Sequence, residues 1–190
     1  MVRTLNLDGD KQADLSVHGG VSKAVYAYPA EHYDFWAKEL PDLKFSYGMF
    51  GENLTTEGLL ETETSIGDRF RVGGCELVVT EPRMPCYKLG IRFERPDIVK
   101  RFLDSRLTGI YFAVLEEGEI NAGDSMELLT RDKNGVRVDD ITRLYAGDMG
   151  DSNMLRRAAE LEALPEKWRE YFRHKLEKNT RAANISPTPG

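Results

Sequence analysis

Cysteine and long apolar runs are scarce in this chain of 190 residues. Its two cysteines, Cys75 and Cys86, are too few for a disulfide framework, and neither has the paired C-x-x-C spacing of a structural zinc site. No apolar run approaches the ~20 residues that a membrane-spanning helix requires. These shortages exclude a disulfide-rich secreted scaffold, a zinc ribbon and a helical membrane protein. Any thiol chemistry must rest on one cysteine.

Positive charge is also in short supply, with 26 Lys and Arg against 32 Asp and Glu and a net charge of -6. This balance disfavours a general nucleic-acid surface, because such proteins neutralise phosphates with a basic face. The start, MVRTLNLDGDKQADL, has no apolar stretch behind basic residues and does not resemble a secretory signal. We therefore expect a cytoplasmic protein with neither nucleic acid nor membrane as its partner.

Short strands and two helices are predicted before residue 138. AVYAY predicts a strand, and PAEHYDFWAKEL predicts a helix that proline opens. DRFRV and CELVVT flank a Gly-Gly turn and predict a hairpin. RPDIVKRFLDSR predicts a second helix, and IYFAVLEEGEI and NAGDSMELLT predict two more strands. Together these elements predict a β-barrel-like fold of the α+β class.

The pattern becomes helical near Asp139. Apolar residues then recur at helical spacing through SNMLRRAAELEALPEKWREYFRHKLEKN. Such short helices cannot stabilise themselves alone, so we expect them to pack as a small bundle or against the barrel. The predicted division is a barrel domain over 1–138 with a short N-terminal part, a helical region over 139–178 and a disordered tail over 179–190.

The segment EPRMPCYKLG places Cys86 on a stiff connection after a strand, because Pro82 and Pro85 exclude a helix interior there. The stretch from Pro82 to Arg95 holds four cations and one acid: Arg83, Lys88, Arg92 and Arg95, with Glu94. Cations near a thiol favour the thiolate, which is both the nucleophile and the metal ligand. The same cations would attract an anionic ligand such as a phosphate.

The residues alone leave Cys86 open between a reactive thiol and a packed one. Cys75 begins the apolar strand CELVV and is predicted to be a small buried hydrophobic residue. A disulfide between the two is disfavoured in a cytosolic protein. His32 and His174 lie on predicted helices among aromatic residues, which favours packing roles over catalysis.

Two further segments could contact a ligand. In HGGVSK, His18 precedes two glycines that let backbone amides approach an anion, and Lys23 follows closely. The alternative is a turn with a solvent-exposed lysine. In FGENL, Glu52 and Asn53 could present a carboxylate and an amide to a site, or form a capped turn.

Four ordered stretches resemble the MOSC family, named for the C-terminal domain of molybdenum cofactor sulfurases, and in particular its bacterial YiiM-like branch. They are LDGDKQADLSVHGGVSKAVYAYPAEHYDFW, FGENLTTEGL, IGDRFRVG and PRMPCYKLG. The resemblance spans roughly residues 6 to 130, and the helical C-terminus is similar to the three-helix appendage of that branch. It implies a MOSC-type β-barrel with a cleft.

The resemblance also implies a role for Cys86. In relatives that reduce amidoximes, the cysteine of this motif binds molybdenum held by a pterin dithiolene, and in other members it is proposed to carry a persulfide. One departure is that relatives usually have a further segment, with an opening strand, before the stretch that matches LNLDGD. We therefore expect a truncated start that removes a barrel edge or part of the cofactor cleft.

The function implied is reduction of N-hydroxylated compounds, such as hydroxylamino-purines or amidoximes, with the molybdenum cofactor (Mo-molybdopterin), which would serve detoxification. Cys86 would bind the metal, and His18 could deliver a proton to the leaving oxygen. The pterin, its phosphate or the oxyanion would contact five further residues: Lys23, Glu52, Asn53, Arg83 and Lys88.

Reduction also implies an external electron-donor protein, because the sequence has no cluster-binding or flavin-type motif. Two alternatives stay open. One is a sulfur carrier or cofactor-delivery protein with a Cys86 persulfide, and the other is a ligand-binding module whose thiol is structural. The sequence also leaves a homodimer open.

Overall fold

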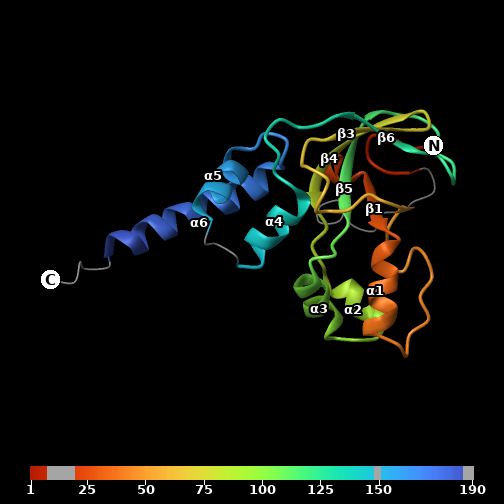
Figure 1. Ribbon diagram of the computed structural model, residues 1–190, viewed down its shortest axis with the longest axis horizontal. Coiled ribbons are helices and arrows are strands. Elements are labelled where there is room, and N and C mark those ends of the chain that lie inside the picture. Colours follow the sequence, from red (N-terminus) through yellow and green to blue (C-terminus); the bar gives the residue numbers. More distant parts are fainter. Residues whose placement is uncertain (8–19, 148–150, 186–190) are drawn as a thin grey trace.

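The computed structural model describes residues 1–7, 20–147 and 151–185, with the side chains of the last helix described up to residue 180. The described strands form one sheet of six (Figure 1). They are β1 (Val25–Pro29), β2 (Leu54–Thr56), β3 (Arg69–Val72), β4 (Cys75–Pro82), β5 (Ile110–Glu116) and β6 (Met126–Thr130). The helices are η1 (Val21–Lys23, a 3-10 turn), α1 (Glu31–Glu39), α2 (Tyr87–Phe93), α3 (Ile98–Ser105), α4 (Val138–Tyr145), α5 (Ser152–Glu160) and α6 (Glu166–Ile185).

The sheet has the order β2-β1-β5-β4-β3-β6. Strands β1 and β2 are parallel, and the other neighbours are antiparallel. The predicted hairpin is β3–β4, which turns at Gly73 and pairs Val72 with Cys75. Register shifts along the β4–β5 pair lie at Glu76/Leu77 and Val79/Glu81. Such irregularities bend and twist strands, and the sheet curls into a half-barrel.

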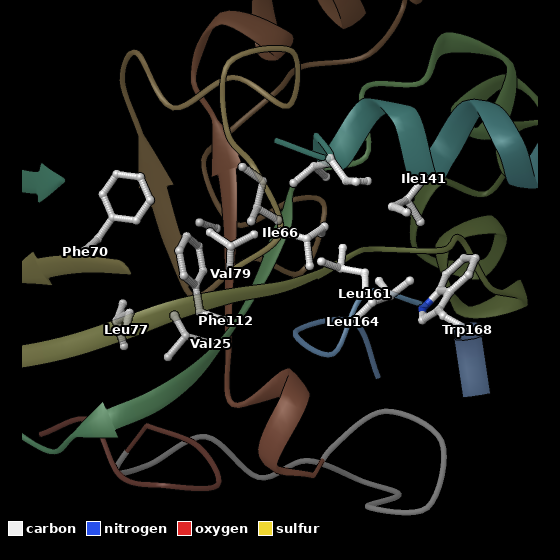
Figure 2. Packing of buried hydrophobic residues seen from close by; sticks show 14 of the residues in the cluster. Val25, Ile66, Phe70, Leu77, Val79, Phe112, Ile141, Leu161, Leu164 and Trp168 are labelled. Carbon is white, nitrogen blue, oxygen red and sulfur yellow. The ribbon is translucent and has the colours of Figure 1, made fainter. Parts of the chain in front are cut away.

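The larger core joins the sheet to the helices at the C-terminal end. Figure 2 shows Ile66 and Val79 beside Leu161 and Leu164, and these side chains belong to one buried cluster that also includes Trp168. Helices α4, α5 and α6 therefore bury their apolar faces against the half-barrel as well as against one another. The expected α+β fold with a helical C-terminal region is confirmed.

A second, aromatic core lies at the other end of the sheet, where α1, α2 and α3 gather (Figure 1). Phe50 stacks on Tyr28 with 4.4 Å between ring centroids, and Trp36 lies parallel to Phe102 at 6.1 Å. Phe93 of α2 contacts Phe50 at 5.1 Å. Because offset and tilted aromatic pairs pack with defined geometry, this core fixes where α2 begins.

Some elements differ from the expectation. The sequence analysis missed β2 and α2, which are both short. It predicted the strands that are now β5 and β6 but not which strands they pair with in the sheet. Strand β5 lies between β1 and β4, whereas β6 lies at the edge beside β3. Helix α6 continues to Ile185, past residue 178 where we expected the helical region to end. Every helix in the described ranges is too short or too polar to span a bilayer.

Candidate active site

Cys86 lies where an extended connection meets a helix. Strand β4 ends at Pro82, and Cys86 has an extended backbone (φ -129°, ψ 171°) immediately before α2. The predicted exclusion of helix up to Cys86 is confirmed. Leu89 and Phe93 anchor α2 in the aromatic core, so the Cys86 end of the helix has a fixed position. The Cys86 side chain is half-buried, whereas Cys75 is fully buried, and both thiols are free.

A cavity of about 440 Å³ opens beside Cys86. This volume suits a small organic ligand or cofactor fragment. Five residues that the sequence analysis assigned to cofactor binding line it, namely Lys23, Asn53, Arg83, Cys86 and Lys88. The other lining residues are Tyr26, Phe50, Gly51, Met84, Pro85, Leu89, Arg92 and Tyr111. The fold thus brings together segments that are up to about ninety residues apart in sequence, because β1, β4 and β5 are neighbours in the sheet.

The cavity wall is cationic. Among its described lining residues, four carry positive charge and none is a carboxylate: Lys23, Arg83, Lys88 and Arg92. The whole chain is acidic, so this positive charge is local. Such a wall attracts anions, most strongly where water is partly excluded.

Arg83 is the most constrained of these cations. Its guanidinium carbon lies 5.4 Å from the centroid of the Tyr26 ring and 5.0 Å from that of Phe102. Its Nη1 is buried and has no hydrogen-bond partner among the described residues. Because buried donors are nearly always satisfied, this nitrogen calls for an acceptor inside the cavity. A phosphate or carboxylate oxygen would meet the need with a charge-assisted bond.

Lys23 reaches the same cavity from η1. Its ammonium lies 5.5 Å from the centroid of the Tyr111 ring. Burial lowers the pKa of Lys23, and the nearby carboxylate of Glu81 opposes that shift. Burial raises the pKa of Tyr111 and of Tyr26, so both phenols stay neutral at physiological pH.

Glu81 forms a buried junction behind the Lys23 wall. It is 2% exposed, and its carboxylate accepts hydrogen bonds from the Trp168 indole at 2.8 Å and from the Ser22 hydroxyl at 3.1 Å. The ammonium of Lys167 pairs with it at 3.1 Å. One carboxylate on β4 therefore ties η1, which carries Lys23, to the start of α6.

The two residues predicted in FGENL have different surroundings. Asn53 lines the cavity, and its amide oxygen accepts a hydrogen bond from the backbone N–H of Tyr26 at 2.8 Å. The Glu52 carboxylate instead accepts from the Tyr33 hydroxyl and from the backbone N–H of Gly48 at 2.7 Å and of Phe50 at 3.1 Å. Glu52 thus organises the loop that carries Phe50 and Asn53, and it lies outside the group of lining residues.

The two histidines considered next are a proposed proton donor and a proposed packing residue. His18 lies outside the described residues. His32 is buried, contacts the Tyr28 ring edge-on at 5.2 Å, and its Nε2 lies 2.7 Å from a carboxylate oxygen of Glu61. The other Glu61 oxygen accepts the backbone N–H of Gly109 at 2.6 Å. The predicted packing role of His32 fits these contacts.

Sequence reasoning missed several residues of the site. Arg92 was noted as a cation but not placed in the site, because α2, which puts Lys88 and Arg92 one turn apart on one helix, was not predicted. Tyr111 and Glu81 gave no signal in the local sequence. Their roles depend on strand neighbours and on α6, which local sequence does not specify.

A half-barrel carrying a half-buried cysteine in a cationic cavity, followed by three helices packed on the same core, defines the class of this protein. The family model described as the MOSC domain matches residues 14–127, and the model described as the YiiM-like, 3-alpha helix domain matches residues 138–179. The chain belongs to the MOSC family and carries the helical region of its YiiM-like members.

Relatives and solved structures agree with this assignment. The protein YflK of Bacillus subtilis is 42% identical over 173 residues, which cover 91% of this chain and 78% of YflK. A Gibberella moniliformis protein named reductase is 36% identical over 157 residues, covering 80% of this chain and 28% of that protein. The crystal structure of YiiM from Escherichia coli matches with a TM-score of 0.82 and 31% identity, covering 94% of this chain and 85% of that one.

Proposed function

We propose that this protein is a cytoplasmic, molybdenum-cofactor-dependent reductase of N-hydroxylated compounds such as hydroxylamino-purines and amidoximes. The observation that carries the proposal is the half-buried thiol of Cys86 inside a cavity lined by four cations. Membership of the MOSC family and a relative named reductase support an oxidoreductase role. In this proposal the barrel domain over 1–138 holds the site, and the helical region over 139–178 packs behind it.

The residues present fit a molybdenum pterin. A thiolate is a soft ligand that suits a redox-active metal, and a pterin dithiolene brings sulfur ligands of its own, so one protein thiolate suffices. The pterin phosphate or a substrate oxyanion would satisfy the buried Nη1 of Arg83. Lys23 and Lys88 line the same cavity and would contribute positive charge to hold the same anion.

When bound, the cofactor supplies the two-electron redox chemistry. The net reaction converts an N–OH group to N–H and water and consumes two electrons and two protons. The protein's part is to bind and orient. Arg83, whose guanidinium packs on the Tyr26 and Phe102 rings, would fix one end of the ligand, and Asn53 presents a polar edge whose position the Tyr26 backbone sets. We retain His18 as the proposed proton donor to the departing oxygen.

The test is turnover with an artificial donor. Protein loaded in cells that make the molybdenum cofactor is supplied with chemically reduced methyl viologen and 6-hydroxylaminopurine or benzamidoxime. We expect reduction by the wild type and by Cys75→Ala, and a loss of at least about 100-fold in Cys86→Ser, because loss of a residue that merely supports a metal ligand already costs about 10–100-fold. A loaded wild type that reduces neither substrate refutes the proposal. A persulfide mass adduct on Cys86 of metal-free protein would then favour the sulfur carrier.

A further inference from the structure

Helix α2 exposes apolar side chains directly beside the candidate site. Tyr87 and Ile91 lie one helical turn apart and are each 68% exposed. They point away from the buried face of α2, whose Leu89 and Phe93 enter the aromatic core. Exposed apolar groups that cluster and are rimmed by polar residues mark interaction sites in soluble proteins.

The charges around these side chains select the kind of partner. Lys88 and Arg92 lie on the same side of α2 and also line the cavity, and α2 contains no acidic residue. The nearest acid along the chain is Glu94, which caps the C-terminal end of α2 and is exposed, and Asp97 beyond it pairs with Arg95 at 3.2 Å. Positive charge on α2 itself therefore exceeds the single negative charge at its end. Because the chain as a whole has a net charge of -6, this local positive face would orient an acidic protein toward α2.

The position of the face also fits delivery of electrons. Cys86 immediately precedes α2, and a helix of seven residues rises only about 10 Å, so any point along α2 lies close to the thiol. An iron–sulfur cluster commonly takes four cysteines, whereas this chain has two and Cys75 is fully buried; the described residues also hold no cluster of three or more His, Cys, Asp or Glu that could bind a metal. The electrons that the proposed reduction consumes would therefore have to reach the site from outside the described residues.

We propose that the face of α2 formed by Tyr87, Lys88, Ile91 and Arg92 is the docking surface for an acidic electron-transfer protein. Tyr87 and Ile91 would supply the apolar contact, and the two cations would steer the approach. The inference rests on the proposed reductase function and adds the place where its donor binds. Each turnover needs two visits of a one-electron carrier.

Ile91→Glu tests the surface, because Ile91 does not line the cavity. The matched control is Leu115→Glu, which places the same charge at a 51% exposed leucine on β5. Reduced plant-type [2Fe–2S] ferredoxin serves as the protein donor and methyl viologen as the small donor. We expect KM for ferredoxin to rise about tenfold in Ile91→Glu only, with viologen turnover unchanged in both variants.

Direct titration of ferredoxin onto the protein, without substrate, should give the same order of affinities and weaken as salt is raised. Ile91→Lys keeps the positive face and should change KM for ferredoxin less than Ile91→Glu does.

The inference is overturned if ferredoxin shows no saturable binding to the wild type, or if Ile91→Glu and Leu115→Glu have equal KM for ferredoxin. Binding to anionic vesicles or self-association through α2, each lost in Ile91→Glu, would also overturn it. A wild type inactive with viologen refutes the reductase function instead.

Discussion

The buried carboxylate of Glu81 offers a sharp test of how the helical region is held to the barrel. Glu81→Leu would leave the Trp168 indole N–H, the Ser22 hydroxyl and the Lys167 ammonium without their acceptor. An unsatisfied buried donor costs about 1–3 kcal/mol, and loss of one partner of a buried ion pair costs about 3–5 kcal/mol. Lys167 is 55% exposed, so water can solvate its ammonium and offset much of the free-energy cost of losing the ion pair. We expect Glu81→Leu to lower the free energy of unfolding by about 3 kcal/mol.

Glu81→Gln should be milder, because its amide can face the Ser22 hydroxyl, which can accept as well as donate. The Gln carbonyl then keeps the Trp168 bond and loses only the assistance of the charge, at a cost of about 1 kcal/mol. The control is Glu166→Gln on α6, where the carboxylate is 52% exposed, against 2% for Glu81. It should cost less than about 1 kcal/mol.

Urea unfolding followed by tryptophan fluorescence measures all three variants, and Trp168 reports directly on the junction. For a chain of this size, each kcal/mol shifts Tm by roughly 2–4 °C, so Glu81→Leu should melt roughly 6–12 °C below the wild type. If Glu81→Leu is no less stable than Glu166→Gln, the junction does not hold α6 to β4, and the reasoning is wrong.

Two further predictions concern titratable groups. Iodoacetamide should label Cys86 in the native protein and Cys75 only after unfolding, because Cys75 is fully buried and burial raises its pKa. Peptide mass spectrometry measures the labelling of each cysteine, and equal labelling rates for the two in the native protein would contradict this. Burial likewise raises the pKa of Asp139 above its ordinary 3.8, and its Oδ1 lacks a partner among the described residues. In the unfolded chain Asp139 has its ordinary pKa, and in the folded state its pKa is higher, so between these two values the folded state binds more protons. The free energy of unfolding therefore falls as pH rises from the unfolded pKa through the folded pKa. Asp139→Asn should unfold at higher urea than the wild type at pH 7, with the difference vanishing below pH 3.8; an unchanged difference would refute the assignment.

Local patterns predicted the elements that local forces determine. The spacing of Tyr33, Trp36 and Leu40 marked α1, and the Gly-Gly turn marked the β3–β4 hairpin. The expectation that proline opens the helix was wrong, because Pro29 ends β1 and α1 begins at Glu31. Helix α2 was missed because its seven residues follow two prolines and include a glycine, and propensity over so short a window carries little information. Its stability comes from Leu89 and Phe93 in the aromatic core, which is a tertiary effect.

The sequence predicted the site residues whose type and position near Cys86 were enough to suggest a role. It did not predict which way a side chain points. Cations near Cys86 could be read from the sequence, and Lys23, Arg83 and Lys88 do line its cavity. Whether a carboxylate faces a cavity or a loop depends on partners elsewhere in the chain, as with Glu52 and Tyr33. The junction at Glu81 joins residues 87 positions apart through a sheet and a helix, a contact that periodicity cannot specify.

The number of molybdenum atoms per chain, measured by mass spectrometry on protein purified from cells that make the cofactor, tests most directly whether Cys86 is a metal ligand. The account predicts about one per chain for the wild type and for Cys75→Ala, and almost none for Cys86→Ser. Molybdenum retained at the wild-type level by a folded Cys86→Ser variant would contradict it.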